Sequence, residues 1–284
     1  MAENNPVMGF VRYSLKENSW KKSKDIFEEK YFNYRFDIFK NITLKSFQNQ
    51  NDMNFMLFLL HSANMPQEYQ EQFNQLEREN SFLRNVYLRD GEEALQEFLL
   101  STNQYIFSGN VSVNFRIDND DGIPSDFISR LRGYCKSDFA GHAISIPNIY
   151  VVQRISKDKF FLQKRNLPGN SIGFAYITGK NNYKTIIGFG DHGLIIKNMP
   201  TILLPEQVQG GIQTINGGNV TNGITVHGKL LGKFTKSQLN EYLNEHFNIE
   251  PDCLKICRTN IIILFFIFIK PAIKYLIRKI LKLW

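Results

Sequence analysis

The stretch Val111-Ser112-Val113-Asn114-Phe115-Arg116-Ile117-Asp118-Asn119-Asp120-Asp121-Gly122 decides how this chain folds and where its chemistry lies. Apolar and polar residues alternate in its first half, which is the pattern of a β-strand with one buried face. Three carboxylates then follow within four positions. Ligands of open α/β sheets bind beyond the carboxyl ends of the strands, so we expect these aspartates at a binding edge.

Carboxylates this close together repel one another, and the repulsion raises the pKa of a member of the group. A hard divalent cation such as Mg²⁺ or Mn²⁺ removes this penalty, because it prefers oxygen ligands and also binds diphosphates. Arg116 faces the same side of the strand as Asp118 and would pair with a phosphate group. An ion pair between Arg116 and the aspartates is the alternative interpretation. The acidic turn therefore predicts a metal-assisted site.

Basic residues are concentrated at the C-terminal end of the 284-residue chain. Residues 253–284 contain seven Lys or Arg and no Asp or Glu. The whole chain has 34 basic and 27 acidic residues, so residues 1–252 carry 27 of each and the net charge of +7 comes from the tail. This distribution argues against a nucleic acid partner and favours a basic tail that meets an anionic surface.

The tail itself contains two patterns. Ile261–Ile269 is apolar but too short to cross a hydrocarbon core of roughly 30 Å. Basic residues then recur every four positions among apolar ones, which predicts a basic amphipathic helix lying in a membrane interface (Lys270, Lys274, Arg278 and Lys282). A terminal helix packed on the core and a membrane span over Ile261–Leu283 are the alternatives. We therefore expect a domain over 1–252 and a membrane-associating tail over 253–284.

The start of the chain lacks the pattern of a secretory signal, and we expect its three cysteines to be reduced thiols. These features predict a cytoplasmic protein that is peripherally associated with the inner face of the cell membrane. Its oligomeric state does not follow from the sequence.

Predicted strands and helices alternate along the first half of the chain. Strands are expected at Phe10–Val11, Asn54–Leu60, Asn85–Leu88 and the acidic strand, and helices over Phe36–Gln48, from Pro66, over Glu92–Leu100 and after an N-cap at Ser125. This alternation predicts an α/β fold with a mostly parallel sheet covered by helices. Further strands are expected over Ala143–Val152, broken at Pro147, over Lys159–Gln163 and over Lys184–Phe189. Thr235 and Gln238 form a capping box, and a glycine-rich stretch over Gly210–Gly223 is either a mobile lid or a surface loop.

Several blocks of the sequence resemble the rhamnosyltransferase family of bacterial glycosyltransferases. One of them is the acidic block, Phe115-Arg116-Ile117-Asp118-Asn119-Asp120-Asp121, whose Asp118-Asn119-Asp120 fits the Asp-x-Asp signature of GT-A glycosyltransferases. The other blocks are Val11-Arg12-Tyr13-Ser14, Arg35 to Gln50, and the strand Phe55 to Leu60 with Met65-Pro66 and Tyr69. Lys45 replaces the usual proline, and Asn216 stands where the family often has His.

The resemblance implies a GT-A-like, Rossmann-like fold and a transfer reaction from a nucleotide sugar. Asp118 and Asp120 would hold a divalent metal, Mn²⁺ or Mg²⁺, together with the donor ribose and diphosphate. Arg12 and Ser14 would lie where the nucleotide binds. His192 would complete the metal shell, with His227 as its rival.

Two aspartates are candidates for the base that deprotonates the acceptor hydroxyl, Asp121 and Asp191, and the spacing selects neither. The expected function is metal-assisted transfer of a sugar, with rhamnose as the candidate, from dTDP-rhamnose or a UDP-sugar. The acceptor would be a cell-surface glycan or a lipid-linked molecule. A metal-dependent phosphohydrolase and a non-catalytic carbohydrate-binding or scaffold protein are the alternatives.

Overall fold

A computed structural model describes residues 5–15, 26–89, 91, 93, 95–98, 111–179, 184–190, 192–216, 229–244 and 246–257. Its larger sheet has the strand order β3-β2-β1-β4-β8-β5-β9. These strands are β1 (Val7–Arg12), β2 (Met56–Ser62), β3 (Leu83–Leu88), β4 (Val111–Arg116), β5 (Ala143–Ser145), β8 (Phe174–Gly179) and β9 (Thr201–Leu203). β3, β2, β1 and β4 run parallel, whereas β8 is antiparallel to both of its neighbours. The expected α/β fold with a mostly parallel sheet is confirmed.

The order of the strands reverses at β1. The chain builds β2 and β3 on one side of β1 and then returns to place β4 on the other side, where Phe10 is in register with Arg116. Connections leave these two strands in opposite directions, so a crevice opens beyond their carboxyl ends. The acidic turn follows β4 directly and therefore lies at this crevice.

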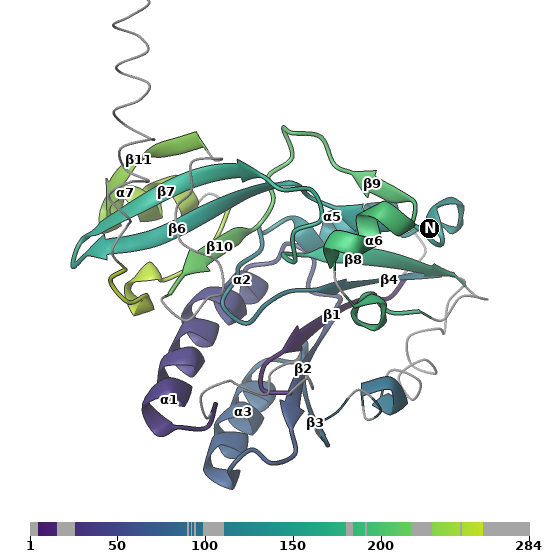
Figure 1. The fold of residues 1–284 in the computed structure, drawn as a ribbon, viewed down its shortest axis with the longest axis horizontal. Helices are drawn as coiled ribbons and strands as arrows, with labels where there is room; N and C mark the ends of the chain where they lie inside the picture. The colour runs from purple at the N-terminus through teal and green to yellow at the C-terminus, as the bar shows by residue number, and fades with distance from the viewer. Residues whose placement is uncertain are drawn as a thin grey trace, which may run out of the picture.

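A second sheet has the order β10-β6-β7-β11 and forms a separate layer in Figure 1. Its strands are β6 (Asn148–Ser156), β7 (Lys159–Asn166), β10 (Ile212–Ile215) and β11 (Lys229–Thr235). An isolated antiparallel bridge joins Gly122 to Ile212 of β10. The acidic turn is therefore held between the two sheets.

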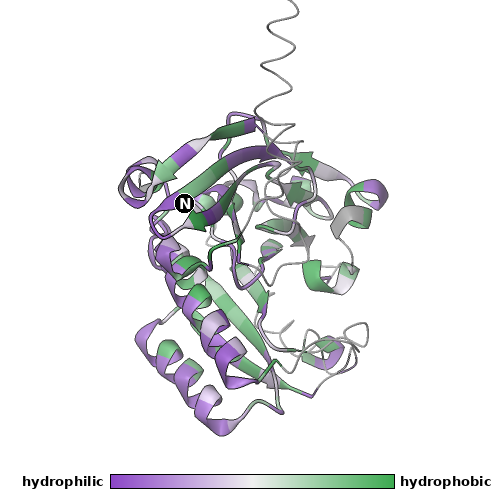
Figure 2. Cartoon of the chain, turned by 60° about the vertical axis from the view of Figure 1, so that its left-hand side comes forward, coloured by the Kyte–Doolittle hydropathy of each residue, from purple (hydrophilic) through white to green (hydrophobic). Residues whose placement is uncertain are grey.

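The helices cover the sheets with their apolar faces. They are α1 (Glu29–Ile38), the π-helix η2 (Phe39–Leu44), α2 (Lys45–Gln48), α3 (Gln67–Glu79), α5 (Phe127–Tyr134), α6 (His192–Asn198) and α7 (Lys236–Asn244), with 3-10 turns η3 (Ser137–Phe139), η4 (Ile186–Phe189) and η5 (Pro251–Cys253). α1 and α3 lie side by side, where the rings of Phe32 and Tyr69 stack with centroids 3.7 Å apart. Figure 2 shows hydrophobic strands beneath helices whose outward faces are hydrophilic.

The central strand β4 is fixed by aromatic packing. Phe115 is fully buried, stacks on Phe47 of α2 at 6.0 Å and meets Phe127 of α5 edge-on at 5.0 Å. Gly9 of β1 lets this ring approach, since a Cβ there would lie 2.4 Å from Cζ of Phe115. Through this one ring, the strand that carries the acidic turn is packed against both α2 and α5.

Three local expectations were wrong. Lys184–Phe189 is not a strand: Ile186–Phe189 forms the 3-10 turn η4, and the backbone N–H of Ile186 donates to the buried side chain of Asn114 at 2.6 Å. Ser125 does not cap α5, whose N-cap residue is Asp126. The first helix begins at Glu29 rather than Phe36.

Other expectations were met in detail. The capping box is present: the backbone N–H of Thr235 donates to Oε1 of Gln238 at 3.0 Å, and the backbone N–H of Gln238 donates to Oγ1 of Thr235 at 3.3 Å. Gly210 and Gly211, at the start of the glycine-rich stretch, pack closely: Cβ atoms there would lie 2.2 Å from the carbonyl of Asn148 and from the side chain of Ile172.

The predicted basic tail helix and the glycines Gly217, Gly218 and Gly223 lie outside the described residues. Within the part of the chain that the structure describes, no helix is both long enough and apolar enough to span a bilayer.

Candidate functional site

The candidate site lies at the crevice beyond β1 and β4, where four of the predicted residues come together. Arg12 ends β1, Arg116 ends β4, and Asp118 and Asp120 follow in the acidic turn. The charges of Arg116 and Asp118 both act on the pKa of Arg12. The parallel pairing of the two strands thus brings together groups that lie about a hundred positions apart in the sequence.

The two arginines form the positive side of this site. Burial, followed by repulsion from Arg116, lowers the pKa of Arg12 to about 10, while Asp118 acts in the opposite direction. Arg116 lies 3.9 Å from Asp118 and donates to the carbonyl of Gly190 at 3.4 Å. A 3.9 Å ion pair is too long for a strong hydrogen bond. Two neighbouring guanidiniums with one nearby carboxylate make a site suited to a dianionic group.

Asp118 is the accessible carboxylate of the acidic turn. Its side chain is 51% exposed, whereas that of Arg116 is 13% exposed. Oγ of Ser171, in the loop before β8, donates to Oδ2 of Asp118 at 2.9 Å. Asp118 therefore has a fixed orientation and can still reach a ligand from solvent.

Asp120 is the carboxylate held between the two sheets. Nδ2 of Asn216, just after β10, donates to its Oδ2 at 2.7 Å, and Oγ1 of Thr214 donates to its backbone carbonyl at 2.6 Å. Burial and then the charge of Asp118 raise the pKa of Asp120 to about 6, while Asn216 and Arg35 oppose this shift. The site therefore carries the electrostatic penalty that the sequence pattern predicted.

Asp121 lies deeper, beneath the turn. Its side chain is 2% exposed, and its Oδ1 is buried without a hydrogen-bond partner among the described residues. Burial, with the charges of Asp120 and Asp118, raises the pKa of Asp121 well above its usual range. Its predicted role as a catalytic base stays a prediction.

Of the remaining predicted residues, Ser14 is described in full, whereas little or nothing is described of His192, Asp191 and His227. Ser14 is 2% exposed, and its hydroxyl accepts a hydrogen bond from the backbone N–H of Ser62 at 3.1 Å, so it joins the ends of β1 and β2. His192 begins α6, two positions after the Gly190 carbonyl that Arg116 contacts. Asp191, His227 and the His192 side chain lie outside what is described. Among the described residues, no three His, Cys, Asp or Glu side chains form a metal-binding group.

Four further residues at the site were not predicted, namely Tyr34, Arg35, Ser171 and Asn216. Arg35 of α1 donates to the carbonyl of Tyr13 at 2.6 Å, lies over its ring at 4.9 Å and lowers the pKa of Asp120 by its charge. The family resemblance gave two signals, the block that begins at Arg35 and the departure from the family pattern at Asn216. The others come from loops or helices with no pattern of their own.

Comparison with known families identifies the chain. The family model described as "Putative rhamnosyl transferase" matches residues 5–228, and the chain belongs to this family. The α/β, GT-A-like fold class predicted from the sequence agrees with this membership. No curated protein matches the chain.

Several solved structures are similar to the chain at low identity. TarS 1–349 of S. aureus in complex with UDP-GlcNAc is 11% identical, with a TM-score of 0.43 over 78% of this chain and 62% of that one. GalNAc-T7 with UDP, GalNAc and Mn²⁺ is 8% identical, with a TM-score of 0.39 over 74% of this chain and 44% of that one. The inositol-1-phosphate CTP transferase of T. maritima is 12% identical, with a TM-score of 0.34 over 75% and 90%. The chain thus spans less than two thirds of the TarS chain it matches.

Proposed function

We propose that this protein is a glycosyltransferase that takes its sugar from a nucleotide-sugar donor whose diphosphate binds at the β1–β4 crevice. The observation that carries the proposal is the convergence of Arg12, Arg116, Asp118 and Asp120 on one edge of the sheet. The guanidiniums can bind phosphate oxygens through paired N–H donors. Rhamnose, carried as dTDP-rhamnose, is the candidate sugar because the chain belongs to the rhamnosyl transferase family, and a UDP-sugar is the alternative donor.

A divalent cation fits the residues present. Asp118 offers an exposed carboxylate, and the raised pKa of Asp120 reflects a negative charge that its surroundings compensate poorly. A bound cation reverses this effect because it is the largest local charge. We propose that Asp118 and Asp120 hold Mn²⁺ or Mg²⁺, which would neutralise the departing nucleotide diphosphate. His192 is the candidate for a further ligand.

The acceptor is proposed from the sequence of the tail. Residues 253–284 would place the enzyme on the inner face of the cell membrane, close to a lipid-linked or cell-surface glycan acceptor. Deleting residues 258–284 should move the protein into the soluble fraction of a cell lysate. Membrane association that persists in this variant would refute the role of the tail.

A panel of nucleotide sugars tests the proposed donor. Thermal unfolding of the full chain is followed with dTDP-rhamnose, UDP-GlcNAc and other donors, each with Mn²⁺ or with EDTA, because a ligand that binds the folded state raises its melting temperature. We expect one class of nucleotide sugar to raise the melting temperature in the presence of Mn²⁺ but not with EDTA. Release of the nucleotide diphosphate is then measured with and without a glycan acceptor.

Asp120→Asn is the matched variant for this assay. It keeps the shape of the side chain but removes its charge. We therefore expect release of the nucleotide diphosphate to slow by at least a hundredfold, which is the order seen when a group that stabilises charge in the transition state is lost. Asp138→Asn is the control, because Asp138 lies exposed in η3. Release of free phosphate without an acceptor would instead indicate a phosphohydrolase. Binding without any turnover would indicate a carbohydrate-binding or scaffold protein.

A further inference from the structure

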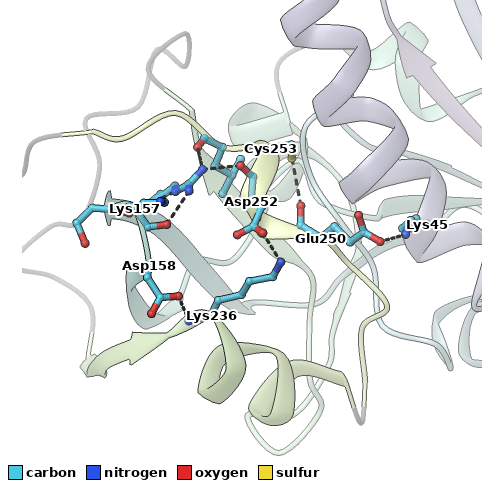
Figure 3. Close-up of polar contacts among 10 residues, drawn as sticks. Lys45, Lys157, Asp158, Lys236, Glu250, Asp252 and Cys253 are labelled. Carbon is cyan, nitrogen blue, oxygen red and sulfur yellow. Dashed lines mark hydrogen bonds and ion pairs between the residues drawn. The ribbon is translucent and has the colours of Figure 1, made fainter.

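The segment of residues 250–257 is fastened to the protein beside the candidate site. Pro251 and Leu254 are buried. Glu250 forms an ion pair with Lys45 of α2, and Asp252 forms one with Lys236 of α7, as Figure 3 shows. The segment is therefore anchored to two helices that cover different parts of the fold.

The second sheet holds the other end of the same segment. The guanidinium of Arg154 on β6 donates to the carbonyls of Asp252 at 2.5 Å and Leu254 at 3.1 Å. The backbone N–H of Cys257 donates to the carbonyl of Arg154 at 2.8 Å, and Gln153 donates to the carbonyl of Cys257 at 2.9 Å. The 250–257 segment thus has a defined path along β6.

A chain of hydrogen bonds connects this segment to the acidic turn. The backbone N–H of Lys255 donates to the hydroxyl of Tyr34 at 3.0 Å, and that hydroxyl donates to the carbonyl of Asn216 at 2.9 Å. The amide of Asn216 in turn donates to Asp120 at 2.7 Å. The ammonium of Lys255 also lies 3.7 Å from the centre of the Tyr34 ring.

Tyr34 is placed so that its hydroxyl acts as both acceptor and donor. It projects from α1, a third element, and joins two segments that have no sequence proximity. Asn216 needs such a restraint, because its side chain must stay in place against a carboxylate that is repelled by Asp118 and Asp121. A hydrogen bond to the Asn216 backbone fixes the point from which this amide reaches Asp120.

We propose that Tyr34 is a positioning residue that couples the 250–257 segment to Asp120 through Asn216. The coupling itself depends only on the contacts above. Its consequence, tighter binding of a cation at Asp120, rests on the proposed function. Loss of the Tyr34 hydroxyl should loosen the segment and the acidic turn together.

Hydrogen exchange measured by mass spectrometry on the full chain tests the coupling without any assay of activity. Tyr34→Phe keeps the ring under Lys255 and removes only the hydroxyl. We expect amide exchange at residues 118–121 and at 251–257 to become about fivefold faster, the equivalent of losing one modest hydrogen bond. Tyr87→Phe is the control, because Tyr87 also has a bonded hydroxyl, to the carbonyl of Gln70 at 3.2 Å, in a different part of the fold.

Asn216→Ala cuts the chain of bonds at its other end. It should speed exchange at residues 118–121 and leave 251–257 unchanged. In the double variant with Tyr34→Phe, exchange at 118–121 should be no faster than in Asn216→Ala alone, because coupled residues are not additive. Additive effects, or unchanged exchange at 118–121 in Tyr34→Phe, would overturn the proposal.

Titration with Mn²⁺, monitored by electron paramagnetic resonance, tests whether Tyr34 strengthens cation binding at Asp120. We expect Tyr34→Phe to weaken Mn²⁺ binding about fivefold and Tyr87→Phe to leave it unchanged. If the wild-type chain binds no Mn²⁺ while the exchange results hold, the coupling stands and the proposed metal site fails. If Mn²⁺ binds equally well to the wild-type protein and to Tyr34→Phe, the proposed positioning role of Tyr34 is refuted.

Discussion

Nδ2 of Asn216 donates a hydrogen bond to Oδ2 of Asp120 at 2.7 Å, although 96 positions separate the two residues. This contact crosses from the second sheet to the acidic turn. It fixes one oxygen of the carboxylate that we propose as a cation ligand.

The first prediction concerns this contact. Asn216→His places an imidazole N–H group, which is also a possible metal ligand, at the same position. We therefore expect the nucleotide sugar still to raise the melting temperature of this variant. Asn216→Leu removes the hydrogen bond to Asp120. It should weaken binding of the nucleotide sugar by roughly 1–2 kcal/mol, about tenfold, because Asp120 loses this partner. Equal stabilisation in both variants would show that the contact does not matter for binding.

The second prediction concerns the arginine pair. Arg116→Lys keeps the charge but loses the planar fork that binds two phosphate oxygens, so the KM for the donor should rise about tenfold with a smaller change in kcat. Arg12→Lys should act in the same direction. Arg84→Lys serves as the control, because the Arg84 guanidinium contacts the carbonyls of Ser81 and Leu83 on the far edge of the sheet. A KM that stays at the wild-type value would exclude the pair from donor binding.

The third prediction concerns the pH dependence of stability. Burial lowers the pKa of His61 to about 3; its hydrogen bond to Asn85 opposes this shift and the charge of Arg35 adds to it. The folded state therefore keeps His61 neutral, whereas the unfolded state takes up a proton below the ordinary histidine pKa of 6.5. This residue alone should reduce the free energy of unfolding by about 1.4 kcal/mol per pH unit as the pH falls from 6.5 toward 3.

His61→Asn removes this contribution. Although the variant loses packing, its urea-unfolding free energy should fall less steeply than that of the wild-type protein between pH 6.5 and roughly 4.5. Parallel slopes for the two proteins would show that His61 does not titrate in this way.

The fourth prediction concerns the packing that places β4. Gly9→Ala would put a Cβ 2.4 Å from Phe115 and 2.6 Å from Leu57, so the strand must shift, and we expect a loss of about 1–3 kcal/mol in the free energy of unfolding. Gly133→Ala is the matched control: its Cβ meets no atom within 4 Å in helix α5. The control should leave stability unchanged or raise it by up to about 1 kcal/mol. Urea denaturation of both variants measures the difference.

Local patterns in the sequence determined the elements that depend on neighbouring residues. Alternation over Val111–Arg116 predicted β4, because the side chains of a strand point alternately to its two faces, although the structure buries both faces of β4. The Thr235–Gln238 capping box predicted the start of α7, because both hydrogen bonds form within four positions. The aspartates after β4 predicted the binding edge, because the direction of a parallel strand sets where its carboxyl end lies.

Contacts between distant segments were decided only by the tertiary structure. The antiparallel strand β8 lies between β4 and β5, and no periodicity indicates which strands will pair. Tyr34 meets Asn216 across 182 positions and Lys255 across 221, and no local pattern in the sequence pairs these residues. Their hydrogen bonds exist because two sheets and a helix pack together. The acidic turn was therefore visible in the sequence, whereas the partners that hold it were not.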